Sequence, residues 1–374
     1  MSADIGRLIE LVEAFAQQRI LVLADLVADE FVFGEIDRVS REAPVLILRQ
    51  QKTGCVPGGG ANAANNLADL GARIIPVGVV GDDPAGRALL DYFRAKEVST
   101  SGIVMQRGWT TPAKTRYFAG WTHTALQQVL RVDRQPSGPL PAQARHALER
   151  RALQQARKAG AILVSDYGFG AITPRLVHKL GRSGGPPVML DSRYSLLDFR
   201  GTGVTAATPN EPELEALYHR RIGNDTVELE RLGRRALRHL KLRALLVTRG
   251  KDGMVLFEPQ RRPQAIPVFG ADDPVDVTGA GDTVIAAFTL AVAAGATFPE
   301  AARLANYAAG IVVMKRGTAT VTRAELLAAL HSEVSGSATP TLRSGLAQES
   351  SPRRGTPKRG ARKDGTPKNG TRKK

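Results

Sequence analysis

Short apolar runs, rich in β-branched residues, recur along the chain and alternate with longer segments of helical periodicity. The runs occupy residues 20–23, 74–80, 161–164, 188–190 and 244–247. Strands that alternate with helices form βαβ units, which place the strands parallel in one sheet with helices on both faces. Strands buried on both faces are apolar throughout, as these runs are. The alternation therefore predicts an α/β fold with a mostly parallel central sheet.

Two segments do not fit a sheet that is covered by helices. Residues 31–52 contain β-prone pieces around Gly34 and Pro44, and a second extended patch covers residues 113–133. Their composition favours strands over helices. We expect both segments to form a small β lid on a main domain of residues 1–335, which would have three layers, α/β/α.

Composition excludes several classes of protein. Hydrophobic residues make up 43% and charged residues 24% of the 374 residues, which excludes collagen-like, mucin-like and wholly disordered chains. Cys55 is the single cysteine, so no intramolecular disulfide can form, and a reducing compartment is favoured. No run approaches the roughly 18 apolar residues that a membrane span needs. We expect a cytoplasmic protein with no membrane partner.

The C-terminal segment 336–374 differs from the rest of the chain. It is rich in Ser, Gly, Thr, Pro, Lys and Arg, and it repeats GTPK at 355–358 and 365–368. Residues 343–374 carry +9 of the net charge of +16, from eleven Lys and Arg against two acidic residues. Such a segment cannot bury enough apolar surface to offset its ordering entropy, which predicts a disordered tail. Its charge predicts contact with polyanions, and a solvated extension without a partner is the equal alternative.

The sequence DVTGAGDT, residues 276–283, precedes an apolar helical pattern. Gly279, Ala280 and Gly281 permit a tight turn whose backbone N–H groups point outward at the positive end of the following helix. Asp282 then lies in the first turn, where it can accept the proton of a substrate hydroxyl while the amides stabilise a transferred phosphoryl group. The alternative is that Asp282 only caps the helix.

A second glycine-rich sequence, PGGGANAANNLADLG, covers residues 57–71. Gly58 and Gly59 let the backbone approach a ligand closely, and Asn62 and Asn66 can hydrogen-bond to sugar hydroxyls. These four residues are therefore candidate substrate ligands.

Asp25 comes directly after the predicted strand at 20–23. Open α/β sheets bind ligands at the carboxyl ends of their strands, and an aspartate can accept hydrogen bonds from two vicinal hydroxyls. Asp25 is therefore a further candidate substrate ligand. A turn-capping role for this side chain is an equal alternative.

With both glycine motifs in this order, the chain resembles the ribokinase-like carbohydrate kinases of the PfkB family over residues 18–330. The sequences TPNEPELE at 208–215 and VTRGKDG at 247–253 are similar to further family segments. The resemblance implies a ribokinase-like fold and an ATP-dependent sugar kinase that uses Mg-ATP, with Asp282 as the base. It also implies a set of residues that bind ATP: Asn210, Glu213, Thr248, Gly250, Gly253 and Asn306. Of these, Glu213 would also be associated with magnesium. Asp276 and Thr278 would bind a monovalent cation, expected to be K⁺.

Within the family, the chain is similar to the kinases that phosphorylate C1 of D-glycero-β-D-manno-heptose 7-phosphate to the 1,7-bisphosphate, a lipopolysaccharide precursor. It departs from their pattern at Gly168 and Phe169, where they tend to have lysine, and at 191–194, where DSRY replaces DPKG. Lysines near a sugar site are natural ligands for a substrate phosphate, so Arg193 is the candidate replacement. Another sugar, sugar phosphate or nucleoside is the alternative acceptor.

The resemblance also bears on assembly and on a rival class of function. We expect a homodimer through the β lid, and we expect a kinase alone because no nucleotidyltransferase-like sequence follows. The rival is a non-catalytic protein on a kinase fold that binds nucleic acid through its tail. The intact Asp282 and its glycines argue against this rival.

Removal of residues 336–374 tests the division between domain and tail. We expect the kcat/KM of a sugar kinase to stay within about twofold, because no candidate site residue lies beyond Asn306. Retention on a heparin column is expected to fall, because most of the polyelectrolyte attraction is lost. Steady-state kinetics and the eluting salt concentration measure the two effects. A collapse of catalysis would show that the tail reaches the active site or the lid.

Overall fold

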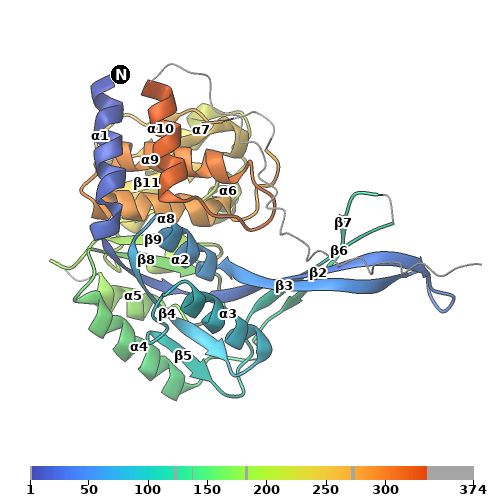
Figure 1. The fold of residues 1–374 in the computed structure, drawn as a ribbon. Coiled ribbons are helices and arrows are strands. Elements are labelled where there is room, and N and C mark those ends of the chain that lie inside the picture. Colours follow the sequence, from blue (N-terminus) through green and yellow to red (C-terminus); the bar gives the residue numbers. More distant parts are fainter. Residues whose placement is uncertain (1, 122–123, 137, 182–183, 271–273, 335–374) are drawn as a thin grey trace, which may run out of the picture. The chain divides into compact units, whose positions relative to one another are not determined.

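Nine strands form the central sheet of the computed structural model, which describes residues 2–121, 124–136, 138–181, 184–270 and 274–334 (Figure 1). The strand order is β13-β12-β11-β10-β9-β8-β1-β4-β5, and all strands run in the same direction except β12, which is antiparallel to both of its neighbours. The strands are β1 (Arg19–Ala24), β4 (Arg73–Gly81), β5 (Ile103–Gln106), β8 (Ala161–Asp166), β9 (Val188–Ser192), β10 (Ala206–Ala207), β11 (Ala244–Thr248), β12 (Met254–Phe257) and β13 (Gln264–Ile266). The predicted tail, 336–374, and its predicted contacts lie outside the described residues.

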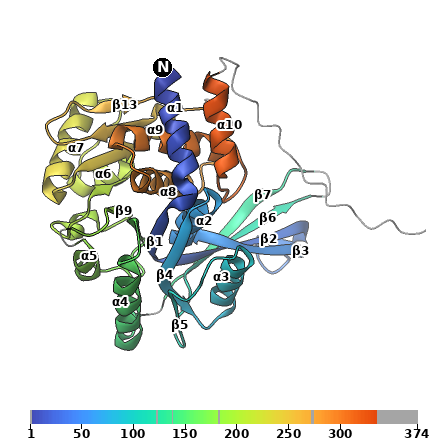
Figure 2. The ribbon, with the colours of Figure 1, turned by 60° about the vertical axis from the view of Figure 1, so that its left-hand side comes forward.

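Helices cover both faces of this sheet (Figures 1 and 2). One face packs against α1 (Ser2–Glu13), α2 (Gly60–Asp69), α3 (Pro84–Ala95), α8 (Ala280–Ala293), α9 (Phe298–Val312) and α10 (Arg323–Val334). The other face packs against α4 (Ala142–Ala156), α5 (Pro174–Leu180), α6 (Glu211–Tyr218) and α7 (Thr226–Leu240). Short 3-10 helices are η1 (Ala14–Gln17), η2 (Leu196–Phe199) and η3 (Gly250–Asp252).

Strand β1 shows why the apolar runs are continuous. Ile20 and Val22 are buried in the core on one face of the sheet, and Leu21 and Leu23 are buried in the core on the other. Successive side chains of a strand point to opposite faces, so a strand between two helix layers needs apolar residues at every position. The predicted three-layer α/β/α architecture is confirmed.

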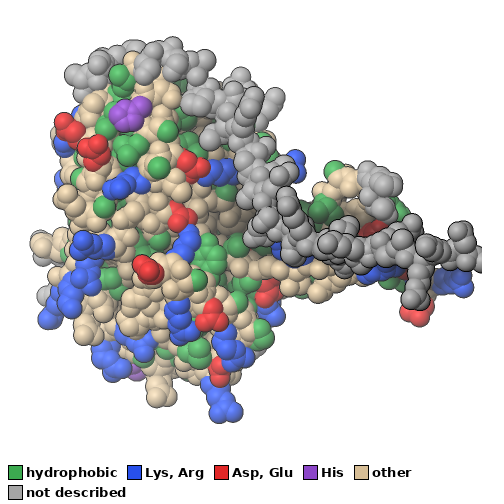
Figure 3. All heavy atoms as spheres, viewed as in Figure 1, with side chains coloured by type: hydrophobic (Ala, Val, Ile, Leu, Met, Phe, Trp, Pro, Cys, Tyr) green, Lys and Arg blue, Asp and Glu red, His purple; other side chains and the backbone are tan. Residues whose placement is uncertain are grey.

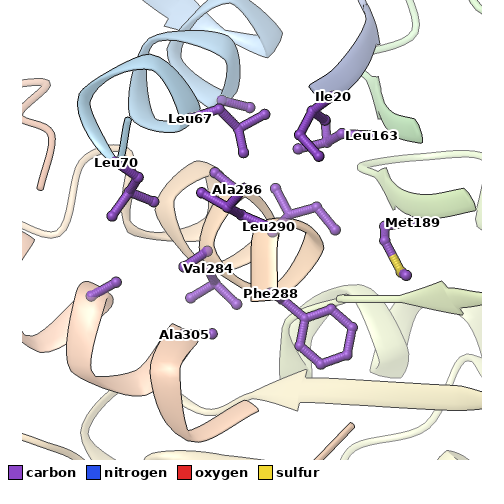
Figure 4. Packing of buried hydrophobic residues seen from close by; sticks show 14 of the residues in the cluster. Ile20, Leu67, Leu70, Leu163, Met189, Val284, Ala286, Phe288, Leu290 and Ala305 are labelled. Carbon is purple, nitrogen blue, oxygen red and sulfur yellow. The ribbon is translucent and has the colours of Figure 1, made fainter. Parts of the chain in front are cut away.

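Helix α8 is enclosed on all sides, which sets it apart from an amphipathic surface helix. Figure 4 shows Val284, Ala286 and Leu290 of α8 packed among Leu67 of α2, Ala305 of α9 and side chains of the sheet. A helix that is apolar all round belongs in a core. The N-terminus of α8 is therefore held in place by the packing around the whole helix.

Four further strands form the lid, a second sheet in the order β3-β2-β6-β7 that extends from the body (Figure 1). These strands are β2 (Leu26–Val39), β3 (Leu46–Gly59), β6 (Ala113–Gly120) and β7 (Gln127–Arg134). The predicted β lid is thus present, and its first hairpin reaches closer to the body than residues 31–52. The reason is that β2 follows β1 after Asp25 alone, and β3 runs directly into α2.

Basic and acidic side chains are interspersed over the body on the face that Figure 3 shows. Ion pairs form on helix surfaces, such as those of Arg231 with Glu228 and of Arg234 with Glu230. In the described part of the chain, no helix has the length and apolar character to cross a membrane.

Leu290 tests how far the fold depends on the enclosure of α8. Its side chain is fully buried, so Leu290→Ala is expected to lower the free energy of unfolding by about 2–5 kcal/mol, from lost burial and the cavity left behind. Urea unfolding followed by circular dichroism measures the change. Val227→Ala, at a helix position that is 76% exposed, is the control and is expected to change stability by less than about 0.5 kcal/mol. Equal effects of both substitutions would contradict this account of the core.

Candidate active site

The carboxylate of Asp282 is buried in the first turn of α8. Asn62 Nδ2 donates a hydrogen bond to Oδ2 at 3.0 Å, and the Tyr167 hydroxyl donates to Oδ1 at 2.9 Å. Burial raises the pKa of Asp282 from 3.8 to about 6, although these two hydrogen bonds act to lower it. A carboxylate with this pKa can act as a general base near neutral pH.

Gly279 allows α2 and α8 to meet at this carboxylate. Its φ of +82° is in the left-handed region, and a Cβ on this residue would lie 2.7 Å from Asn62 Nδ2. Any side chain here would therefore strain the turn and displace the amide that holds Asp282. Gly281 has open space where a Cβ would be, and Ala280 begins the helix. The predicted residues 279–282 are thus together at one helix N-terminus.

Asn66 holds Asn62 through a hydrogen bond within α2. Its Nδ2 donates to the Asn62 backbone oxygen at 3.0 Å, and its Oδ1 accepts a hydrogen bond from Thr283 Oγ1 at 3.0 Å. Both asparagines are fully buried. The Asn62 amide thus holds Asp282, and the Asn66 amide holds Asn62. Binding of sugar hydroxyls by these two residues stays a prediction.

A polar cavity of about 380 Å³ opens in front of Asp282. Its walls come from the lid, from the ends of β9 and β11, and from the turn before α8. Among the described residues, its ionisable lining consists of four cationic side chains, four carboxylates and Tyr167: Lys114, Arg116, Arg131 and Arg193, with Asp29, Asp191, Glu213 and Asp282. A cavity lined in this way suits a polar, charged ligand.

Asp29 is the carboxylate that lid strand β2 brings to this cavity. Thr318 Oγ1 donates to its Oδ2 at 2.8 Å, and Arg116 Nη1 lies 3.0 Å from its Oδ1. A Cβ on Gly58 would lie 2.4 Å from Asp29 Cγ, so Gly58 makes room for this carboxylate. Gly59, with a φ of +50°, lines the cavity itself.

Asp25 does not itself line the polar cavity, but it contacts the backbone of Tyr167, which does. Its side chain is 2% exposed, and its Oδ2 accepts hydrogen bonds from the backbone N–H groups of Tyr167 at 2.9 Å and Phe169 at 3.1 Å. Burial raises the pKa of Asp25 to about 7, and the nearby Asp166 adds to this effect. Asp25 therefore holds the segment after β8, and Asp29 is the lid carboxylate at the cavity.

Arg193 follows β9 and lines the polar cavity. Its guanidinium carbon lies 6.0 Å from the centre of the Tyr167 ring. Burial raises the pKa of Asp191 well above its ordinary value, Glu213 adds to this effect, and Arg193 opposes it. Burial also raises the pKa of Glu213, against hydrogen bonds with Asn210 and the charge of Arg193.

Asn210 and Glu213 form the capping box at the start of α6. Asn210 Oδ1 accepts from the Glu213 N–H at 2.8 Å, and Glu213 Oε2 accepts from the Asn210 N–H at 2.9 Å. Both residues line the polar cavity beside Thr248. The local fold therefore needs this pair, and the Glu213 carboxylate also lines the cavity.

A second cavity, of about 470 Å³, adjoins the first across the start of α8. The two share Thr248, Val277 and Gly281 in their linings. The second lining is mainly apolar and contains the remaining predicted nucleotide ligands: Gly250, Gly253 and Asn306. Asn306 Nδ2 donates to the Pro267 backbone oxygen at 2.8 Å, which fixes this side chain.

Asp276 lies in the turn that leads to α8. Its Oδ1 accepts from the Thr278 N–H and its Oδ2 from the Gly317 N–H, both at 2.9 Å. Burial opposes ionisation, but the hydrogen bonds outweigh it and lower the pKa of Asp276. The predicted cation ligand is therefore a carboxylate at neutral pH, and Thr278 beside it lines the polar cavity.

Several cavity residues went unnoticed in the sequence. Lys114 of β6 pairs in register with Asp29 of β2, and Arg116 of β6 pairs with Arg131 of β7. Side chains alternate between the two faces of a strand, so the two-residue spacing of Lys114 and Arg116 would have placed these charges on one face of the lid. Tyr167 carries no such signal, because its place depends on the turn that follows β8.

The arrangement places the Asp282 carboxylate and the N-terminal amides of α8 where a polar and a mainly apolar cavity meet. Oriented amides and a helix N-terminus stabilise negative charge. A base beside them can accept the proton of a hydroxyl in the polar cavity. The site is therefore suited to transfer of an anionic group to an alcohol.

Solved structures share this fold. Arabidopsis thaliana ribokinase complexed with ribose and ATP superposes with a TM-score of 0.66 at 20% identity, covering 84% of this chain and 98% of that one. Escherichia coli phosphofructokinase-2 in complex with substrates and products superposes with a TM-score of 0.68 at 17% identity, covering 85% and 99%. The expected ribokinase-like fold is confirmed.

Sequence comparison gives closer relatives. Bifunctional protein HldE of Desulfatibacillum aliphaticivorans is 38% identical over 331 residues, which is 86% of this chain and 65% of the relative. Bifunctional protein HldE of Geobacter metallireducens is 40% identical over 314 residues, 83% of this chain and 62% of the relative. The chain spans less than two thirds of the length of these two relatives. A profile of the pfkB family carbohydrate kinases matches residues 26–325, and the chain belongs to this family.

Proposed function

We propose that the protein is an ATP-dependent sugar kinase that phosphorylates C1 of D-glycero-β-D-manno-heptose 7-phosphate. The observation that carries this proposal is the Asp282 carboxylate, held by Asn62 and Tyr167 at the α8 N-terminus between two cavities. The substrate rests on the sequence motifs shared with heptose 7-phosphate kinases and on the relatives named bifunctional protein HldE. A kinase for another sugar phosphate would use the same machinery.

The mainly apolar cavity would take the adenine and ribose of Mg-ATP beside Asn306, Gly250 and Gly253. The triphosphate would pass Thr248 and end at residues 279–281. Among the described residues, no group of three or more His, Cys, Asp or Glu is placed to hold a metal ion. This fits magnesium, which binds through substrate phosphates and one or two carboxylates, with Glu213 as the candidate here. Bound magnesium would neutralise phosphate charge.

The proposed chemical step moves one proton and one phosphoryl group. The acceptor oxygen forms a bond to the γ-phosphorus while the bond from that phosphorus to the β–γ bridging oxygen breaks, and the electron pair leaves with ADP. The acceptor proton passes to an Asp282 oxygen. The amides at 279–281 would stabilise the charge on the transferred group.

Asp276 and Thr278 would bind a monovalent cation, proposed to be K⁺, next to the turn at 279–281. The ionised state of Asp276 supports this role. A structure of Escherichia coli phosphofructokinase-2 in complex with potassium is among the fold neighbours, with a TM-score of 0.64 at 17% identity.

The lid would close over the sugar and exclude water. Its outer strand β7 leaves Val129, Leu130 and Val132 exposed, and we propose that a homodimer through the lid covers such side chains. A cytoplasmic location is part of the same proposal, because ATP and the single Cys55 suit a reducing compartment. The non-catalytic alternative is not favoured, because Gly279 and Asp282 are both present at the α8 N-terminus and Asp282 is held there by Asn62.

Asp282→Asn is expected to lower kcat by about 10²-fold or more and to leave ATP affinity within about twofold. The reason is that the carboxylate acts only in the transition state, where it accepts the proton of the acceptor hydroxyl. For the wild type, kcat is expected to fall as the pH drops through about 6, because protonated Asp282 cannot accept a proton. An assay coupled to ADP release, run on heptose 7-phosphate, fructose phosphates, ribose and nucleosides, measures both.

The control for this substitution is Asp91→Asn, at an exposed position on α3 that is expected to leave kcat unchanged. The melting temperature of Asp282→Asn is measured beside kcat, because the amide removes a buried charge but leaves either Asn62 or Tyr167 without its acceptor oxygen. A variant that keeps over half of wild-type kcat would refute Asp282 as the base. A wild type that is inactive on all acceptors would refute the sugar kinase.

Arg193→Ala tests whether the acceptor carries a phosphate. We expect the KM for heptose 7-phosphate to rise about tenfold or more, as for a lost charge-assisted hydrogen bond, and the KM for unphosphorylated heptose to change little. Arg200→Ala, at an exposed arginine that follows η2, is the control. If Arg193→Ala raises the KM for both sugars equally, Arg193 does not bind the phosphate.

A further inference from the structure

The backbone segment 167–169 is fixed by two buried carboxylates. The Tyr167 and Phe169 N–H groups donate to Asp25 Oδ2 at 2.9 and 3.1 Å, and the Gly168 N–H donates to Asp166 Oδ1 at 3.0 Å. Asp25 is 2% exposed and Asp166 is 4% exposed. Three successive amides thus bind carboxylates that lie inside the body.

Asp166 is held in turn by two hydroxyl groups. Ser192 Oγ and Ser195 Oγ donate to its Oδ2 at 2.8 and 2.7 Å. Burying carboxylates is costly unless they accept hydrogen bonds. The bonds to Asp25 and Asp166 come from segment 167–169, from Ser192 at the end of β9 and from Ser195 after it. The structure therefore contains a buried polar network that fixes the position of the Tyr167 backbone.

The side chain of Tyr167 extends from this fixed segment to Asp282. Its hydroxyl donates to Asp282 Oδ1 at 2.9 Å. Its ring has Lys114 Nζ of the lid 5.0 Å from its centre, and a Cβ on Gly59 would lie 3.2 Å from ring carbons. The ring is thus bounded by the lid and by the glycine-rich turn, which leaves the hydroxyl little freedom.

We propose that Tyr167 is a positioning residue for the base: its hydroxyl fixes the orientation of the Asp282 carboxylate for proton transfer from the acceptor. This inference rests on the proposed kinase function. Tyr167 and Asn62 each bind a different oxygen of Asp282, so together they fix the plane of the carboxylate. Each oxygen keeps a further lone pair for the acceptor hydroxyl.

Tyr167 keeps its proton in this place. Burial raises the pKa of Tyr167 well above its ordinary value, and the charge of Asp282 adds to this effect. The hydroxyl is therefore a donor throughout the working pH range. A donor to a carboxylate stabilises the ionised form, so Tyr167 acts to keep Asp282 ready to accept a proton.

Other charged groups around Asp282 set the background for this effect. Asp29 from β2 disfavours its ionisation, and Lys114 from β6 favours it. The charge of Asp282 helps to raise the pKa of Asp191 from β9, which burial raises most, and Arg193 opposes this rise. Tyr167→Phe removes one hydrogen bond and leaves these charges in place.

Tyr167→Phe is expected to lower kcat about tenfold at pH 7 with little change in the KM for ATP. The acid limb of the kcat profile is expected to move up by about one pH unit, because the ionised base loses a charge-assisted hydrogen bond. The ratio of variant to wild-type kcat should therefore rise from pH 6 to pH 8.5. A variant whose acid limb coincides with that of the wild type would overturn the proposal.

Two comparisons separate positioning from general damage. Tyr218→Phe, on α6, removes a hydroxyl that lies 3.4 Å from His239 and is expected to leave the profile unchanged. In an Asp282→Asn background, Tyr167→Phe is expected to add less than about twofold to the loss, because the two residues act as one unit. If the fold-losses in kcat of the two single substitutions multiply in the double variant, the proposal is overturned.

A measurement without turnover keeps this inference separate from the kinase assignment. Carbon-13 NMR of protein labelled at the aspartate carboxyls, with Asp282→Asn to assign the signal, gives the pKa of Asp282 directly. Tyr167→Phe is expected to raise this pKa, and Tyr218→Phe is not. An unchanged pKa refutes the role of Tyr167 even in an active kinase. If Tyr167→Phe raises this pKa but the wild type phosphorylates no sugar, the contact is supported and the kinase function is refuted.

Discussion

The hydrogen bond between Asn62 and Asp282 joins the first turns of two helices that lie 220 residues apart in the chain. It forms because Gly279 has no Cβ in the space between them. Helix α8 is enclosed by α2, α9 and the sheet, so its N-terminus is fixed by packing that reaches well beyond the site. Donors that are held in place before a reaction stabilise developing charge without reorganisation. The dense core around α8 is in this sense part of the candidate site.

Burial and backbone amides set opposite charge preferences for carboxylates that lie near one another. Burial raises the pKa of Asp282 to about 6 and that of Asp25 to about 7. Asp276, in the same turn as Gly279, has a lowered pKa because two N–H groups bind its ionised form. One residue type can therefore supply both a proton acceptor and a permanent negative charge within a few residues of sequence.

The sequence predicted the fold well, because the continuous apolar strands and the helical segments between them are local patterns. It also placed Gly279 and Asp282 together, since their spacing within one turn is fixed by the chain. It did less well where distant segments meet. Asp25 and Asp29 both follow β1, and only the direction of β2 decides that Asp29 lines the cavity. Tyr167 reaches Asp282 through a turn whose shape depends on buried partners, which no local pattern reports.

Strands β1 and β2 are separated by Asp25 alone, so the lid hairpin leaves the body at a residue whose carboxylate binds segment 167–169. The Asp25 carboxylate binds two backbone amides of the segment that carries Tyr167, and the Tyr167 hydroxyl binds Asp282. The junction between β1 and the lid is therefore joined to the Asp282 carboxylate through one residue of the segment after β8.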